Sequence, residues 1–286
     1  MPGLGPLEVT LLPGARALLA AHARELPQRD DLCGAFCGAL ALTAAGVLER
    51  DGQPVDQDAV ALAAGSIVGS VREQGVLPHG ESGRRDYRLA IPMIEDSDLS
   101  GTTAAGLREA IEEVSDGTLA VIPYAGPWTA ETLGGLFDLA VTLEHPVAPI
   151  ANLATHHLWG ASASINQLLD YLLDGVLTGP PPDWDVGHFA CVVGRASGPR
   201  GNLYAIADTY PALGNHGVHM QPQEALATAL ERRDMPAGGM IVVAFAEDAP
   251  LLRAGTSKLG LHESMWDNGT VDPPQDGTAT TQSSTL

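Results

Sequence analysis

A polar turn that passes directly into a helical pattern at Cys33 places the strictest demand on how this chain can fold. The turn holds Gln28, Asp30 and Asp31, and the cysteine follows at once. Residues 33–48 carry apolar side chains at helical spacing, which predicts a helix that begins at the cysteine. Asp30 or Asp31 is expected to cap this helix by accepting from its unpaired N–H groups.

A cysteine at the start of a helix is a candidate nucleophile. The helix dipole and the unpaired N–H groups of the first turn stabilise a thiolate there. The alternative is a small, inert core residue, because free cysteine is often buried. Cys37 lies one turn further along and is expected to pack in the core. A metal site or redox disulfide made by Cys33 and Cys37 has no third ligand nearby in the sequence, so we predict none.

The rest of the chain alternates between helical and extended patterns. Helices are expected at 15–26, 56–71, 102–114, 129–143, 162–177 and 223–232, and strands at 118–124, 146–153, 188–194, 203–208 and 240–245. The polar segment 74–100, rich in glycine and proline, is expected to form a long surface loop, with a lid over the site as one interpretation.

The order of these elements predicts one α+β domain spanning residues 1–248. Its helical half covers about 14–115 and its sheet half about 118–246. The polar Gly, Pro, Ser and Thr content of 249–286 predicts a disordered tail. The nucleophile helix is expected to pack on an antiparallel sheet.

The two strands at 188–194 and 203–208 predict a specific pair of residues. If they form a hairpin whose symmetric turn is centred on Gly198, paired residue numbers sum to about 396 and His188 lies opposite Asp208. Opposed side chains share a face, so the carboxylate could orient the imidazole. A slip of one residue would separate the two side chains. Asp208 could alternatively cap a turn, and His216 and His219 are the fallback bases.

Charge and composition exclude several classes of function. The formal net charge is −20, which leaves no basic face for nucleic acid or an anionic membrane and permits a cationic peptide as substrate. No apolar run reaches the roughly 18–20 residues of a membrane helix, and the first 13 residues carry no cation of a signal peptide. The three cysteines do not form a disulfide framework. We therefore expect a cytoplasmic protein, and the arginine-rich basic content is typical of a bacterial genome of high GC content.

The ordered residues Gln28, Cys33-Gly34, Gly187-His188-Phe189 and Asp208 resemble the papain-like cysteine peptidase superfamily. The resemblance is closest to the bacteriocin-leader (double-glycine) peptidases, and the segment from Asp208 to Pro211 is also similar to phytochelatin synthase. It covers about 26–48 and 144–245. It implies a papain-like fold with Cys33 as nucleophile, His188 as base, Asp208 as its orienting carboxylate and Gln28 as oxyanion donor. Gln28 stands five residues before Cys33, where that family usually has six.

The function expected from these residues is a cysteine peptidase or amidase that cleaves a peptide or amide bond through a thioester. A transpeptidase or acyltransferase of the phytochelatin-synthase type, and an inactive papain-like module that binds a peptide, remain as alternatives. No cofactor and no metal are expected. His156-His157 invites a metal interpretation, but no acidic or cysteine partner lies near the pair in the sequence, so a structural role is favoured.

Overall fold

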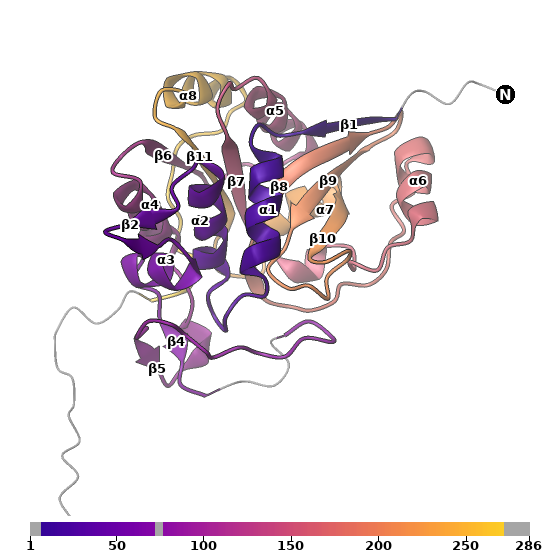
Figure 1. Cartoon of the computed structure of the whole chain (residues 1–286). Coiled ribbons are helices and arrows are strands. Elements are labelled where there is room, and N and C mark those ends of the chain that lie inside the picture. The colour runs from indigo at the N-terminus through magenta and orange to yellow at the C-terminus, as the bar shows by residue number, and fades with distance from the viewer. Residues whose placement is uncertain (1–6, 72–76, 272–286) are drawn as a thin grey trace, which may run out of the picture.

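A seven-stranded antiparallel sheet forms the centre of the α+β fold (Figure 1). The structure is a computed structural model and describes residues 7–71 and 77–271. The strands follow the order β10-β9-β8-β7-β11-β6, and β1 pairs with β8 beside this path. Their bounds are β1 Glu8–Leu11, β6 Leu119–Tyr124, β7 Val147–Ala154, β8 Gly187–Ser197, β9 Asn202–Ala207, β10 Val218–Pro222 and β11 Gly239–Phe245. Four short strands lie outside it: β2 Glu49–Arg50, β3 Gln53–Pro54, β4 Val68–Gly69 and β5 Met93–Ile94.

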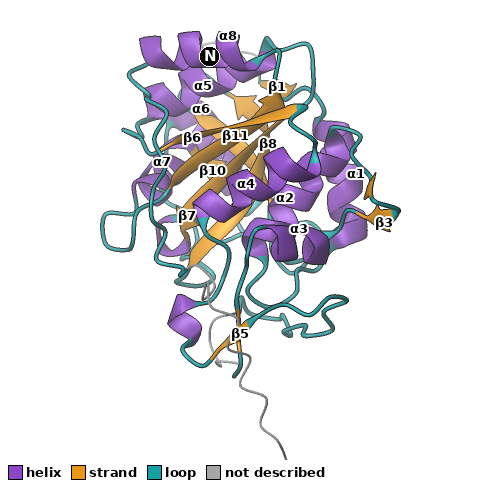
Figure 2. Cartoon of the chain, turned by 90° about the vertical axis from the view of Figure 1, so that its left-hand side faces the viewer, coloured by secondary structure: helices purple, strands orange, loops and turns teal. Residues whose placement is uncertain are grey.

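Helices cover both faces of the sheet (Figure 2). One layer contains α1 and α2, which contact β7 and β8, together with α3 and α4; the other contains α5, α7 and α8, of which α7 contacts the sheet. The helices are α1 Ala15–Glu25, α2 Cys33–Ala44, α3 Gln57–Ala63, α4 Ala104–Val114, α5 Ala130–Val141, α6 Ile165–Asp174, α7 Gln223–Glu231 and α8 Ala249–Lys258, with 3₁₀ turns η1 Ser97–Leu99 and η2 Thr155–His157. In the described residues, no helix has the length and apolar character needed to cross a bilayer.

Helix α2 begins at Cys33, as the pattern predicts, and runs through the core. Phe36 and Leu40 are fully buried, and so is Cys37. Gly38 allows the close packing of α2 on its neighbours, because a Cβ there would lie 2.8 Å from Leu107 Cδ1. The helix ends at Ala44, four residues before the expected end.

The expected caps of α2 are wrong. Neither aspartate caps the helix, whose N-cap residue is Leu32 and has no side-chain cap. Asp30 Oδ1 instead accepts from the backbone N–H of Arg84, and Asp31 Oδ2 accepts from that of Gly69, each at 2.8 Å. Both carboxylates therefore fix segments that are distant in sequence, strand β4 and the loop at Arg84, rather than the helix itself.

The expected helix over 56–71 is shorter in the structure. Asp56 caps it by accepting from the backbone N–H of Ala59 at 2.9 Å, and the helix ends at Ala63. Gly65 then adopts a left-handed backbone conformation, which turns the chain away, and β4 follows. The described part of the expected loop at 74–100 contains β5 and η1, while 74–76 lie outside the described residues.

The β8–β9 hairpin has a different register from the expected one. Its loop closes between Ser197 and Asn202, so residue numbers near the turn sum to 399. A bulge at Val193 then adds one residue to β8, and beyond it Cys191 pairs with Ala207, a sum of 398. The predicted register is therefore wrong. Beyond the bulge, however, the sum of paired residue numbers is even, as in the predicted register, so the same residues of the two strands share a face.

The tail expected from residue 249 is wrong for the part that the structure describes. Helix α8 packs against α5, with Leu252 fully buried. The chain then returns to the sheet, where the backbone N–H of Ser264 donates to Pro123 O at 2.9 Å. Trp266 is buried and donates to Asn152 Oδ1 at 3.3 Å. Residues 272–286 lie outside the described residues.

Candidate active site

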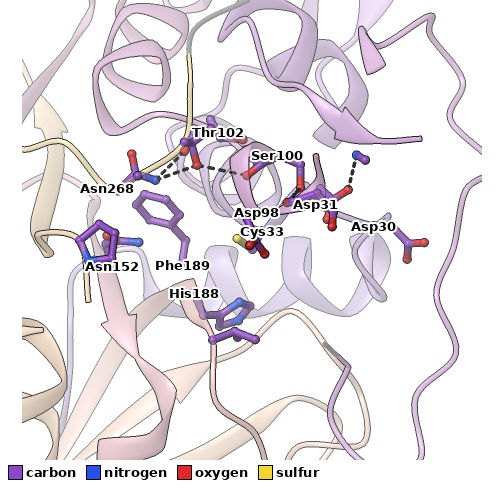
Figure 3. Close-up of a pocket in the computed structure, with 18 of the residues that line it drawn as sticks. Asp30, Asp31, Cys33, Asp98, Ser100, Thr102, Asn152, His188, Phe189 and Asn268 are labelled. Carbon is purple, nitrogen blue, oxygen red and sulfur yellow. Dashed lines mark hydrogen bonds between the residues drawn. The ribbon is translucent and has the colours of Figure 1, made fainter. Parts of the chain in front are cut away.

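Cys33 and His188 line one cavity of about 500 Å³ between α2 and the start of β8 (Figure 3). Cys33 is the first residue of α2 and is half-buried, whereas His188 is buried near the start of its strand. Gln28 lies at the same cavity. The fold thus brings together the thiol, imidazole and amide that the sequence singled out.

His188 is bonded to Asp208 as predicted. His188 Nε2 donates to Asp208 Oδ1 at 2.9 Å, and both side chains are buried. Burial opposes the charged imidazole, but the charge and hydrogen bond of Asp208, with a further contribution from Cys33, outweigh it and raise the pKa of His188 to about 10. Because Asp208 engages Nε2, the imidazole has Nδ1 left for Cys33.

Asp208 is held by more groups than the sequence indicated. Burial would raise the pKa of this carboxyl, but His188 and then His219 hold it well below its usual range. The backbone N–H of Thr209 donates to Oδ1 at 2.7 Å. His22 on α1 donates through Nε2 to the Asp208 carbonyl oxygen at 2.6 Å, and burial lowers the pKa of His22. Nothing in the sequence points to His22, because 186 residues separate it from Asp208.

His219 is not the fallback base that its position suggested. Its Nε2 donates to Asp208 Oδ2 at 3.1 Å. Gln221 fixes this tautomer: its amide oxygen accepts from Trp159 N at 2.8 Å, so its amide N–H donates to His219 Nδ1 at 2.9 Å. His219 therefore orients Asp208. The other fallback base, His216, is exposed and does not line the cavity.

Two aromatic rings flank the His188 imidazole. The Trp184 ring centroid lies 4.7 Å from that of His188, and Tyr210 stacks at 6.4 Å with an interplanar angle of 20°. Trp184 lines the cavity and Tyr210 is buried. These rings pack against the imidazole and restrict its rotation.

Gln28 lines the cavity with Cys33 and His188, and its role as oxyanion donor stays a prediction. Its backbone N–H donates to Thr209 O at 3.0 Å, which ties the turn before α2 to the residue after Asp208. The side chain is buried, and among the described residues Oε1 has no hydrogen-bond partner.

The segment expected to form a lid contributes one wall of the cavity. Arg85, Asp98 and Ser100 lie there. Arg84 fixes the segment, because its Nη1 donates to Pro27 O at 2.9 Å. Movement of this segment as a lid stays a prediction.

His156 and His157 acquire acidic partners through the fold. Asp234 accepts from His156 Nε2 at 2.7 Å and from His157 Nε2 at 3.2 Å, and Asp185 lies 2.7 Å from His156 Nδ1. Burial lowers the pKa of His156, but Asp234 and Asp185 outweigh it and raise the pKa. The fold supplies an acidic partner that the neighbouring sequence lacks, and His156, His157 and Asp234 present donor atoms within 4.8 Å of one another, close enough to hold a metal ion. The expected structural role of the pair stays a prediction.

One protein-family model matches residues 12–267, a span that includes Cys33, His188, Asp208 and helix α8. The chain belongs to DUF6885, a family of unknown function. A search of curated proteins gives no match. Membership of DUF6885 shows that the N-terminal helices, the sheet and α8 are parts of one family unit, and it assigns no activity to the cavity.

Proposed function

We propose that this chain is a cysteine-nucleophile peptidase or amidase that cleaves a peptide or amide bond through a thioester on Cys33. The observation that carries the proposal is the buried bond from His188 Nε2 to Asp208 Oδ1, 2.9 Å long, in the cavity where Cys33 begins α2. A nucleophile, a base and a group that orients the base are the three parts that covalent catalysis requires.

The chemistry follows from the two nitrogens of His188. Asp208 engages Nε2, so Nδ1 exchanges the proton with Cys33. The Cys33 thiolate attacks the carbonyl carbon, an S–C bond forms, and the C–N bond breaks as the imidazolium gives its proton to the leaving nitrogen. Such proton transfer contributes roughly 10²–10⁴ in rate. Water deprotonated by His188 then attacks the thioester carbon, releasing the acid and the thiol.

The negative oxygen of the tetrahedral intermediate needs hydrogen-bond donors. The backbone N–H of Cys33, in the first turn of α2, is one candidate, and the side-chain amide of Gln28 is the second. Gln28 is placed by its backbone bond to Thr209, next to Asp208, so that its position depends on the same residues as the imidazole.

A papain-like architecture is part of this proposal. The helix that begins at the candidate nucleophile packs against β7 and β8. Strand β8 provides the imidazole, and the residue directly after β9 provides the carboxylate. The order Cys33, His188, Asp208 along the chain agrees with the resemblance of its motifs. The cavity of about 500 Å³ beside Cys33 is where this proposal places the peptide or amide substrate.

Acylation by an activated ester tests the proposal. With p-nitrophenyl acetate we expect a burst of p-nitrophenolate equal to one per chain, and an acetyl group mapped to Cys33 by mass spectrometry. Cys33→Ala should give no burst, and Arg108→Gln, on α4 outside the cavity, should behave as the native protein. An acetylation rate at Cys33 no greater than that of free cysteine would refute the proposal.

Added glycine amide then separates hydrolysis from transfer. Release of acetate alone indicates a hydrolase, whereas acetylglycine amide formed in proportion to the acceptor indicates the acyltransferase alternative. A protein that binds peptides but gives no acyl-enzyme would be the inactive module.

A further inference from the structure

Arg232 places a buried positive charge on the wall of the candidate active-site cavity. It follows α7, its side chain lines the cavity, and the residue is only 3% exposed. Nη1 donates to Asn152 Oδ1, while Nε has no hydrogen-bond partner among the described residues. No carboxylate of the described residues forms an ion pair with this guanidinium. Buried charges in proteins are normally paired, so an anion would be stabilised beside this guanidinium.

The backbone makes room for this side chain at a conformational cost. Arg232 has φ 43° and ψ 49°, the left-handed region in which helices usually end on glycine. A Cβ at Gly187 would lie 2.8 Å from Arg232 Nη2, and one at Gly238 would lie 2.2 Å from Arg232 Cδ. Strain of this kind is concentrated at functional sites, where the surrounding structure maintains it.

The guanidinium lies close to the reacting groups. Gly187, on which a Cβ would meet the guanidinium, directly precedes His188 in β8. Burial lowers the pKa of Arg232, and the charge of Cys33 is the influence that opposes this. Arg232, Cys33 and His188 line the same cavity, so an anion held by Arg232 would lie in the cavity that contains the reacting groups.

The cavity offers few other positions where a negatively charged group of a substrate could bind. Asp30, Asp31 and Asp98 line the side of Cys33 away from Asn152 (Figure 3). Arg85 also lines the cavity, but its guanidinium already donates to the carbonyl oxygens of Gly69 and Ser70. The aspartates would repel a carboxylate there, which leaves the wall formed by Arg232 and Asn152.

We propose that Arg232 binds a carboxylate of the substrate, so that the enzyme acts on peptides or amides with a free carboxylate next to the bond that is cleaved. This inference rests on the proposed function of Cys33. Arginine suits the role because its planar, permanently charged fork matches a carboxylate. Asn152 would hold the fork in place through Nη1.

Two alkylating reagents that differ by one charge test this proposal. Iodoacetate carries a carboxylate and iodoacetamide does not, and both form the same S–C bond with loss of iodide. In the native protein we expect the ratio of their rates at Cys33, iodoacetate over iodoacetamide, to exceed the ratio for free cysteine by about tenfold or more. Arg232→Gln should return this ratio to that of free cysteine, and Arg108→Gln should leave it unchanged.

The outcomes separate this proposal from the proposed function. If Arg232→Gln slowed the alkylation of Cys33 by both reagents equally, Arg232 would act only on the thiolate, and the carboxylate proposal would be overturned. An unaltered ratio in that variant would overturn it as well. A rate with iodoacetamide no faster than that of free cysteine would instead count against the proposed function.

A second measurement uses only the native protein, in case Arg232→Gln does not fold. N-acetylglycine should protect Cys33 from iodoacetamide in a concentration-dependent way, whereas N-acetylglycinamide should protect at least tenfold less well. Equal protection by the acid and the amide, or none by either, would contradict a carboxylate site.

Discussion

His188 Nε2 and Asp208 Oδ1 lie 2.9 Å apart, although no rung of the β8–β9 ladder pairs the two residues. The last paired rung there joins Cys191 to Ala207. Alternation along each strand then puts His188 and Asp208 on one common face. Without the extra residue at Val193, the register near the turn would put them on opposite faces. The bulge is therefore what allows the carboxylate to reach the imidazole.

Replacing Asp208 by asparagine should impair the chemistry. The variant removes the negative charge that keeps His188 protonated and oriented, so we expect acylation of Cys33 by p-nitrophenyl acetate to slow by about 10² or more. Asp138→Asn is the matched control, because Asp138 pairs with Arg195 outside the cavity. Equal rates in the two variants would remove Asp208 from the mechanism.

His219 should contribute to stability through the second oxygen of Asp208. His219→Phe leaves Oδ2 buried without this donor, which should lower the free energy of unfolding by about 1–3 kcal/mol. His219→Gln supplies an amide donor and should recover a large part of that loss. Urea unfolding of both variants gives the comparison, and identical losses would argue that the bond to Asp208 adds nothing.

The raised pKa of His188 predicts a fall in stability at alkaline pH. Between its ordinary value of 6.5 and about 10, the folded protein keeps a proton on His188 that the unfolded chain has lost. Rising pH therefore favours unfolding in this window. The full contribution of His188 to the free energy of unfolding is present only below pH 6.5. The difference in unfolding free energy between native protein and His188→Gln should shrink from pH 7 to pH 10. A difference that grows with pH would show that the imidazole is neutral when folded.

Gly38 should be intolerant of even one methyl group. In Gly38→Ala the Cβ would meet Leu107 Cδ1 at 2.8 Å and Val60 Cγ1 at 2.9 Å, which we expect to cost about 1–3 kcal/mol. Gly134→Ala on α5 is the control, because its Cβ would lie 3.9 Å from Tyr204 Oη and should stabilise the helix by about 0.5–1 kcal/mol. Equal unfolding midpoints would contradict the close packing of α2.

Local patterns predicted the elements well, because propensity and periodicity act over short distances. Helices α1, α4, α5 and α7 and strands β6, β7, β8, β9 and β11 lie close to their expected ranges, whereas no strand was predicted at β10. The hairpin register failed because loop closure and the bulge at Val193 depend on neighbours in space, such as Leu12, whose N–H donates to Val193 O. The His188–Asp208 pair was correct although its register was not.

Long-range partners explain the other errors. Asp30 and Asp31 had local signals as caps, but bonds to loops 38 to 54 residues away use their carboxylates. Asp234, which follows α7, lies 78 residues after His156 in the sequence, and only the fold brings the two side chains together. Helix α8 lies in polar sequence, and its burial comes from contacts with α5. None of these contacts has a signature within a short window of sequence.

The most direct test of the account is the rate at which iodoacetamide alkylates each cysteine at pH 7, followed by peptide mass spectrometry. Cys37 and Cys191 are buried and should stay unlabelled, so they serve as internal controls. We predict that Cys33 reacts at least about tenfold faster than free cysteine and that His188→Ala removes this advantage. A Cys33 that reacts no faster than free cysteine, or as fast without His188 as with it, would contradict the account.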